Sequence, residues 1–154
     1  KNRIESFFNP TTGTHNFQSD KAIDAITSGG FFGKGIGEGT LKNRVPEAHT
    51  DYIISVISEE FGVVIIILLL IVFLCFIYNV FKKLYVEKNE KIKLILAGSI
   101  TLILVQTLIH LGVNIRLFPT TGMTLPYLSY GGSSIVGVSI LSGIILNLTK
   151  RKLN

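Results

Sequence analysis

The sequence has little charge and almost no cysteine. Only 16% of its 154 residues are Asp, Glu, Lys or Arg, against roughly 25% in ordinary soluble domains, and 47% are hydrophobic. Together with a mean hydropathy of +0.50, this balance argues against a soluble globular protein. Cys75 is the one cysteine, so an intrachain disulfide and a cysteine-based zinc site are both excluded.

Charge is missing altogether from three long stretches. Residues 61–81 are almost entirely apolar, and as a helix they span about 31 Å, close to the roughly 30 Å of bilayer hydrocarbon. Residues 94–115 form a second run, which also holds some polar side chains. The third run, 117–149, is broken by prolines and glycines, so only 133–148 fits a continuous helix. The sequence therefore predicts an all-α polytopic membrane protein with three transmembrane helices.

The formal net charge of +5 comes from fifteen Lys and Arg against ten Asp and Glu. Eight of the fifteen cations lie in two short segments: Lys82, Lys83, Lys88, Lys91, Lys93, Lys150, Arg151 and Lys152. By the positive-inside rule these segments are cytoplasmic. Nucleic-acid binding is disfavoured, because no aromatic residues alternate with the basic ones. The predicted order is an extracytoplasmic loop with a Gly-rich stretch and short helices (1–52), a helix entering and spanning the membrane (53–81), a basic cytoplasmic loop (82–93), a transmembrane helix (94–115), an extracytoplasmic Pro/Gly loop (116–132), a transmembrane helix (133–149) and a cytoplasmic tail (150–154).

The long polar segment contains a helix signal and a glycine-rich stretch. Ser19 is a candidate cap for a helix that ends at Gly29. Residues 28–40 read SGGFFGKGIGEGT, which matches neither the P-loop nor the dinucleotide-binding spacing. Two interpretations stay open: a flexible loop, or backbone lying close against a phosphate or sugar ligand, with Lys34 and Lys42 supplying charge.

Ionisable side chains gather before the first span. Glu47, His49 and Asp51 could act as a base or bind a cation, and the alternative is that they are solvated loop charges. In the second loop, the glycines and serines of residues 131–134 could direct backbone N–H groups at an anion, or could form a turn that only packs. His110 has no second metal ligand near it in sequence, so a hydrogen bond between helices is favoured over a metal site.

Two long motifs resemble a known family. SGGFFGKGIGEGTLKNRVPEAHTDYIISVISEEFG and FPTTGMTLPYLSYGGSS are similar to the SEDS family (shape, elongation, division, sporulation), and the resemblance covers essentially the whole chain. The motifs are most like the division branch, and the elongation branch shares much of them. The family fold has about ten transmembrane helices, so the resemblance implies a carboxyl-terminal fragment: the large external loop and the last three helices.

The resemblance also implies a function. The family polymerises lipid II into peptidoglycan by inverting glycosyl transfer, with undecaprenyl diphosphate as leaving group and a class B penicillin-binding transpeptidase and other division proteins as partners. It acts in the bacterial inner membrane, in the division branch at the septum. Asp51 of the HTD motif corresponds to the catalytic base. The implied substrate-binding residues are Lys34, Lys42, Arg44, Glu47, His49, Ser129, Gly131, Gly132, Ser133 and Ser134. A divalent cation, Mg²⁺ or Mn²⁺, could aid or replace the lysines, and no metal ligand is assigned.

Some features depart from the family pattern, and two other functions stay open. Many division relatives have Lys where this chain has Thr121, which weakens a diphosphate-binding role for the 116–132 loop. A lipid II flippase would use a similar cavity with discontinuous helices. A non-catalytic membrane anchor for the transpeptidase is the third hypothesis. The fragment alone is expected to be inactive.

Overall fold

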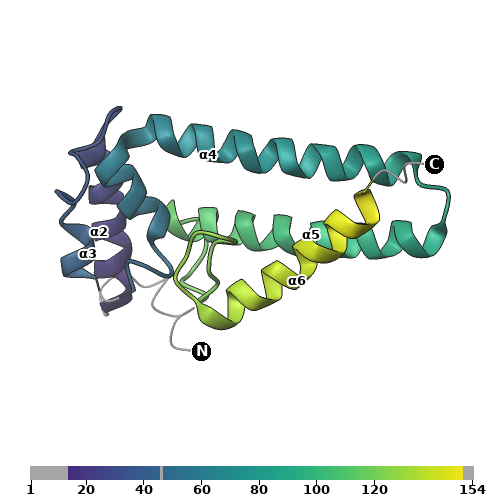
Figure 1. The fold of residues 1–154 in the computed structure, drawn as a ribbon. Helices are drawn as coiled ribbons and strands as arrows, with labels where there is room; N and C mark the ends of the chain where they lie inside the picture. Colours follow the sequence, from purple (N-terminus) through teal and green to yellow (C-terminus); the bar gives the residue numbers. More distant parts are fainter. Residues whose placement is uncertain (1–13, 46, 151–154) are drawn as a thin grey trace.

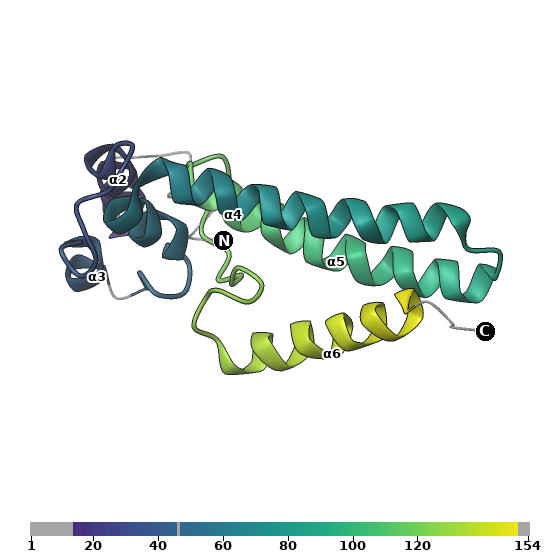
Figure 2. The same cartoon turned by 45° about the horizontal axis from the view of Figure 1, so that its top comes forward.

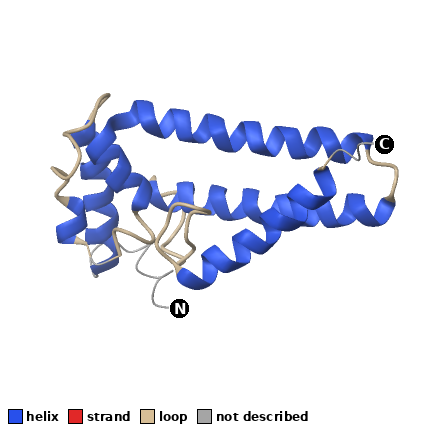
Figure 3. Ribbon diagram, viewed as in Figure 1, coloured by secondary structure: helices blue, strands red, loops and turns tan. Residues whose placement is uncertain are grey.

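The chain folds into helices joined by short connections and two loops. The structure is a computed structural model that describes residues 14–45 and 47–150, and within these residues there is no strand. The helices are α2 (Thr14–Gly29), α3 (Leu41–Arg44), α4 (Ile53–Val86), α5 (Glu90–Asn114) and α6 (Gly132–Thr149), as Figures 1 and 3 show. The last three are long and apolar enough to cross a membrane. The predicted all-helical architecture with three long apolar helices is confirmed.

The long helices define two ends of the molecule. α4 and α5 run side by side and α6 slants along α5, while α2 and α3 gather beside the first turns of α4 (Figures 1 and 2). The α4–α5 connection and the carboxyl end of α6 lie at the opposite end. The clustered lysines of residues 82–93 and Lys150 therefore share one end of the bundle, and the 47–52 turn lies at the other.

The helix boundaries near the lysines differ from the prediction. The 82–93 loop was expected to separate two spans, but α4 continues to Val86 and α5 begins at Glu90. Lysine is a good helix former, so the first lysines mark the end of the apolar run without ending the helix. The Asn89 side chain caps α5 by accepting a hydrogen bond from Lys91 N at 3.1 Å.

Two buried clusters hold the helices together. One lies near the lysine-rich end and joins α4, α5 and α6 through Val80, Leu96, Ile100, Ile103 and Ile145. The other joins α2, α3 and the 47–52 turn to α4 and α5, and its members are Ala22, Ala25, Leu41, Val45, Ala48, Tyr52, Val56 and Val113. Most other apolar side chains on the long helices are exposed, far beyond what a soluble monomer tolerates. The chain is a multi-pass membrane protein.

α4 is broken at Gly62, which has φ 81° and ψ 176° and so needs glycine. The glycine-rich loop bonds to both sides of the break. The N–H groups of Lys34 and Gly35 donate to the carbonyls of Glu59 and Glu60 at 2.9 and 3.1 Å. Beyond the break, the N–H of Val63 donates to the Gly30 carbonyl at 3.0 Å. The loop thereby satisfies backbone groups that the break leaves without helical partners.

The same contacts explain part of the glycine-rich sequence. A Cβ on Gly33 would lie 2.2 Å from the Glu60 carbonyl oxygen, and one on Gly29 would lie 2.1 Å from the Ser58 carbonyl oxygen. These two glycines are needed because the loop packs against α4. The backbone at these two glycines lies close to α4 of the chain itself.

The predicted amino end of α2 is wrong, and its carboxyl end is confirmed. α2 begins at Thr14, so Ser19 is inside the helix and is not its cap. The Ser19 hydroxyl instead hydrogen-bonds the Tyr52 hydroxyl at 3.2 Å. The helix ends at Gly29, and Gly30 follows with φ 58°, the left-handed conformation common just after helices.

Candidate active site

The HTD motif forms a compact turn between α3 and α4. The N–H groups of Thr50 and Asp51 both donate to the Glu47 carbonyl, at 3.2 and 3.0 Å. Asp51 is only 7% exposed and directly precedes Tyr52, the residue before the first helical residue of α4. Glu47 is half-buried and His49 is exposed. The three ionisable residues predicted for the site therefore share one turn at the α2/α3 end.

Tyr52 anchors the turn in the core. Its ring is fully buried among α2, α3 and α4, and its hydroxyl is bonded to Ser19. Burial raises the pKa of the Tyr52 phenol, and the charges of Asp51 and Glu47 raise it further, against the lowering effects of the Ser19 hydrogen bond and the Arg116 charge. The phenol therefore stays neutral near pH 7 and serves as a packing and hydrogen-bonding group.

The loop before α6 holds the turn from one side. Tyr130 N donates to the His49 carbonyl at 3.0 Å, and Ser129 Oγ donates to the Thr50 carbonyl at 2.8 Å. Ser129 is 3% exposed and also accepts a hydrogen bond from Leu125 N at 2.8 Å. Ser129 and Thr50 are 79 residues apart in the sequence, so their hydrogen bond is a tertiary contact between the loop and the turn.

α5 holds the same turn from another side. His110 Nε2 donates to the Thr50 carbonyl at 3.2 Å, which requires the proton on Nε2 because a carbonyl only accepts. Asn114 Nδ2 donates to the Asp51 carbonyl at 2.9 Å, and Asn114 Oδ1 accepts from Ser55 Oγ at 2.8 Å. His110 thus makes the inter-element hydrogen bond that its lone position in the sequence favoured.

The glycines and serines after Ser129 begin α6. Gly131 is the residue before the helix, and Gly132 and Ser133 are exposed at its first turn. The Ser134 hydroxyl accepts hydrogen bonds from Thr124 Oγ1 at 2.5 Å and from Gln106 Nε2 at 3.4 Å. Five residues were predicted as substrate-binding at the end of this loop and the start of α6. Of these, Ser129 hydrogen-bonds to the HTD turn.

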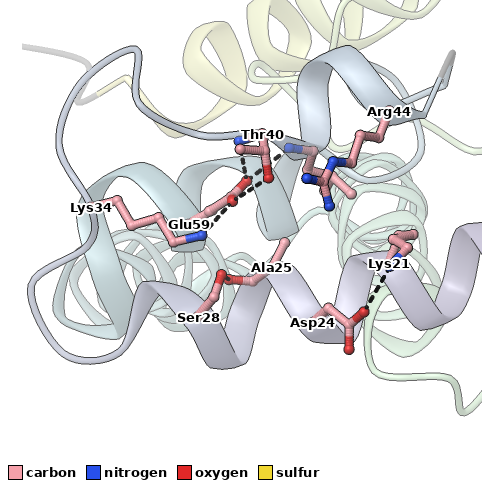
Figure 4. Close-up of a pocket in the computed structure, with 9 residues that line it drawn as sticks. Lys21, Asp24, Ala25, Ser28, Lys34, Thr40, Arg44 and Glu59 are labelled. Carbon is pink, nitrogen blue, oxygen red and sulfur yellow. Dashed lines mark hydrogen bonds and ion pairs between the residues drawn. The ribbon is translucent and has the colours of Figure 1, made fainter.

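Two of the three predicted cations, Lys34 and Arg44, line a separate small cavity of about 140 Å³, shown in Figure 4. Lys34 Nζ pairs with Glu59 at 2.9 Å, and Lys21 pairs with Asp24 at 3.3 Å. Arg44 lines the same cavity and is exposed, while the side chain of Lys42 lies outside the described part of the chain. Lys34 therefore has its charge already balanced by Glu59.

Glu59 was not singled out as an organising residue from the sequence. It is 1% exposed and accepts hydrogen bonds from Thr40 N, Thr40 Oγ1 and Leu41 N at 3.0, 3.1 and 3.0 Å, besides its pair with Lys34. These bonds favour the ionised carboxylate and tie the first residues of α3 to α4. Glu59 lies four residues after the buried Ser55, so both side chains project from the same face of α4, and no local sequence pattern marks that face as buried.

Metal ligands are not gathered in the described residues. Within residues 14–45 and 47–150, no three or more His, Cys, Asp or Glu side chains converge as a metal site would need. In these residues the structure therefore shows no metal site built from protein side chains, and the participation of a divalent cation stays a prediction.

Comparisons with known proteins agree with the motifs. A sequence model of the FtsW, RodA and SpoVE family, described as "Cell cycle protein", matches residues 1–154. The chain is 41% identical to "Probable peptidoglycan glycosyltransferase FtsW" of Enterococcus hirae, covering 97% of the chain and 38% of the relative. It is 37% identical to the protein of that name in Caulobacter vibrioides, again covering 97% of the chain and 38% of the relative.

A solved structure has the same fold. A chain from "Structural coordination of polymerization and crosslinking by a peptidoglycan synthase complex" matches with a TM-score of 0.73 and 27% identity, over 96% of this chain and 40% of that one. The chain spans about two fifths of the length of the relatives it matches. With three apolar helices, both motifs in place and a family match from end to end, the chain belongs to the FtsW/RodA/SpoVE family of cell cycle proteins, the SEDS family.

Proposed function

We propose that the protein containing this chain is a peptidoglycan glycosyltransferase of cell division that polymerises lipid II. The observation that carries the proposal is the HTD turn, which places Asp51 at the end of an apolar helix bundle. The relatives that carry the name FtsW support the reaction class and the division branch. The chain would form the carboxyl-terminal part of the whole enzyme.

The proposed topology puts the turn outside the cytoplasm. Lysines gather at the α4–α5 connection, with Lys150 at the same end, and the positive-inside rule makes that end cytoplasmic. Residues 1–52 and 116–132 would then face the exterior. This arrangement suits a substrate whose polyprenyl tail stays in the bilayer while its sugars and diphosphate lie at the outer surface.

The proposed reaction is an inverting glycosyl transfer. The 4-hydroxyl oxygen of the acceptor sugar bonds to the anomeric carbon of the donor, the bond from that carbon to the diphosphate oxygen breaks, and undecaprenyl diphosphate leaves. Asp51 accepts the hydroxyl proton as the general base. Glu47 and His49, in the same turn, would contact the sugars or a cation, and Ser129 with residues 131–134 would shape the cavity.

Positive charge must stabilise the departing diphosphate. Arg44 is the better candidate in the described chain, because it is exposed at the cavity of Figure 4 whereas Lys34 is engaged with Glu59. Lys42 remains a candidate, and a divalent cation could contribute as well. The lining as a whole carries Lys21, Lys34 and Arg44 against Asp24 and Glu59, so it is only weakly positive.

The proposed partner is a class B penicillin-binding transpeptidase. The solved structure that this chain resembles comes from a complex whose description names both polymerisation and crosslinking, which supports a crosslinking partner. Other division proteins would join the complex. The proposed location is the inner membrane of a bacterium at the division septum.

The test is polymerisation of purified, labelled lipid II by the whole protein with its transpeptidase partner, crosslinking being blocked by a β-lactam. Wild type is expected to make glycan strands, and Asp51→Asn is expected to lose activity by at least about 100-fold, the usual scale for a general base. Glu47→Gln removes the other carboxylate of the same turn, which is proposed to contact the sugars or a cation, and it is expected to lose far less activity than Asp51→Asn. Thermal stability and complex formation are measured for each variant.

Three outcomes would contradict the proposal. Normal strand synthesis by a folded Asp51→Asn enzyme would exclude Asp51 as the base. Translocation of lipid II across vesicles by a wild-type protein that makes no polymer would favour a flippase, and neither polymer nor translocation would favour a membrane anchor.

A further inference from the structure

Three successive carbonyls in the HTD turn are bound by groups from distant parts of the chain. The His49 carbonyl accepts from Tyr130 N, the Thr50 carbonyl from Ser129 Oγ and His110 Nε2, and the Asp51 carbonyl from Asn114 Nδ2. We call these four donors, Tyr130, Ser129, His110 and Asn114, the carbonyl clamp.

The clamp occupies acceptors that a longer α4 would use. In an α-helix, the carbonyls of residues 49, 50 and 51 would accept from the N–H groups of residues 53, 54 and 55. Here the first helical bond of α4 runs from Val56 N to the Tyr52 carbonyl at 3.1 Å. The clamp therefore holds the turn out of the helix, directly upstream of its start.

Asn114 takes the place of one such bond. Its Nδ2 donates to the Asp51 carbonyl at 2.9 Å, and its Oδ1 accepts from Ser55 N at 3.3 Å. Residues 51 and 55 are the pair that a helical bond would join directly, so the Asn114 amide is inserted between them. Asn114 Oδ1 also accepts a hydrogen bond from Ser55 Oγ at 2.8 Å, and Asn114 Nδ2 also donates to the His110 carbonyl at 2.9 Å. The residue is 1% exposed.

We propose that Asn114 is a positioning residue for Asp51, acting with His110 and Ser129 to fix the backbone from which the carboxylate projects. The inference rests on the proposed function, because it assigns the clamp a role in catalysis by Asp51. Without the Asn114 amide, Ser55 N can bond the Asp51 carbonyl directly, α4 lengthens toward the turn, and the Asp51 side chain rotates with the backbone. A displacement of about 1 Å in a reacting group can cost about 100-fold in rate.

The test measures kcat and KM for lipid II polymerisation by the whole protein with its partner. Asn114→Leu keeps the branching and the number of side-chain heavy atoms and removes every side-chain donor and acceptor, and we expect kcat to fall by about 10- to 100-fold with KM changed by less than about threefold. Thr107→Val is the matched control: Thr107 is a buried polar residue of the same helix, and its hydroxyl donates to the Ile103 carbonyl of that helix. It should keep kcat near wild type.

His110 supplies a second test in case Asn114→Leu does not fold. His110→Leu removes the donor to the Thr50 carbonyl, whereas His110→Gln keeps an N–H donor near the Nε2 position. We expect His110→Leu to lower kcat about tenfold and His110→Gln to recover most of it. Ser129→Ala removes the other donor to the same carbonyl and should also lower kcat.

The outcomes separate the clamp from the function on which it rests. The clamp is overturned if Asp51→Asn is inactive while Asn114→Leu, His110→Leu and Ser129→Ala keep wild-type kcat. It is also overturned if the clamp variants lose stability and activity in parallel and His110→Gln restores neither, since that marks a purely structural role. Full activity of a folded Asp51→Asn enzyme would instead overturn the proposed function.

Discussion

Loss of the Glu59 carboxylate should open the loop and short helix that precede the HTD turn. The buried carboxylate receives the backbone N–H groups of Thr40 and Leu41, the Thr40 hydroxyl and the Lys34 ammonium. Glu59→Ala leaves both N–H groups without their acceptor. The perturbation is local, because the four donors all belong to residues 34–41.

The expected size follows from these bonds. Each backbone N–H group left without an acceptor lowers the free energy of opening by about 1 kcal/mol, the lower end of the usual range, since water can enter the cavity beside these groups. The Lys34 pair adds up to about 1 kcal/mol, because Lys34 is itself partly exposed. The total of about 2–3 kcal/mol corresponds to an increase of about 30- to 150-fold in the open fraction of this segment. Glu59→Gln keeps one acceptor oxygen and should cost about half as much.

Limited trypsin digestion of the whole protein in detergent or nanodiscs measures this opening. Cleavage after Arg44 is the reporter: Arg44 is exposed, but the following Val45 is buried and its N–H bonds the Leu41 carbonyl at 3.0 Å. When opening and closing are fast compared with cleavage, the rate follows the open fraction. Glu38→Gln, at an exposed carboxylate of the same loop, is the control and should cleave like wild type.

The expected order of cleavage rates is Glu59→Ala, then Glu59→Gln, then Glu38→Gln together with wild type. A Glu59→Ala rate within about threefold of the Glu38→Gln rate would show that the Glu59 bonds contribute little. The description of Glu59 as the residue that ties α3 to α4 would then be wrong.

Three further predictions concern the break, the topology and the buried tyrosine. Gly62→Ala should lower the melting temperature clearly, since its Cβ would lie 2.2 Å from the Phe31 carbonyl oxygen and the backbone has φ 81°. Gly98→Ala, at a position on α5 where a Cβ meets no other atom, should be neutral or stabilising. Equal melting temperatures for the two variants would refute the packing argument. In a Cys75→Ala background, Asn43→Cys should react with an impermeant thiol reagent from outside the cell and Lys88→Cys should not, and the reverse pattern would invert the proposed orientation. Burial raises the pKa of the Tyr52 phenol, so the folded chain holds this proton more tightly than the unfolded chain does, and the resulting stabilisation is complete below about pH 10 and lost above it. Wild type should therefore lose unfolding free energy at alkaline pH more steeply than Tyr52→Phe. Identical slopes for the two proteins would contradict the burial of Tyr52.

Sequence reasoning predicted the features that depend on local pattern. Long uncharged runs located the three spanning helices, because the bilayer sets a minimum length for them. Gly29 located the end of α2, since glycine is common where helices stop. The HTD motif drew attention to Asp51 through resemblance, and the structure places it in a turn directly before α4.

Tertiary contacts explain what the sequence did not reveal. The break at Gly62 exists because the glycine-rich loop supplies replacement hydrogen bonds, and no pattern around residue 62 announces a partner about 30 residues earlier. Glu59 was not singled out from the sequence, because its carboxylate is held by Thr40 and Leu41, which lie 19 and 18 residues earlier in the chain. A hydrogen bond was expected for His110, but its partner could not be predicted, and Asn114 was not singled out. Their function as donors to the HTD turn depends on how α5 packs against α4.

The central claim is that Asp51 performs proton abstraction in a glycosyl transfer. The most direct measurement is the single-turnover rate of sugar transfer at saturating lipid II, with substrate binding measured on the same samples, for wild type, Asp51→Asn and Glu47→Gln. We predict that Asp51→Asn binds lipid II as wild type does and transfers at least about 100-fold more slowly, while Glu47→Gln transfers much faster than Asp51→Asn. A folded, substrate-bound Asp51→Asn enzyme that transfers at the wild-type rate would contradict the account.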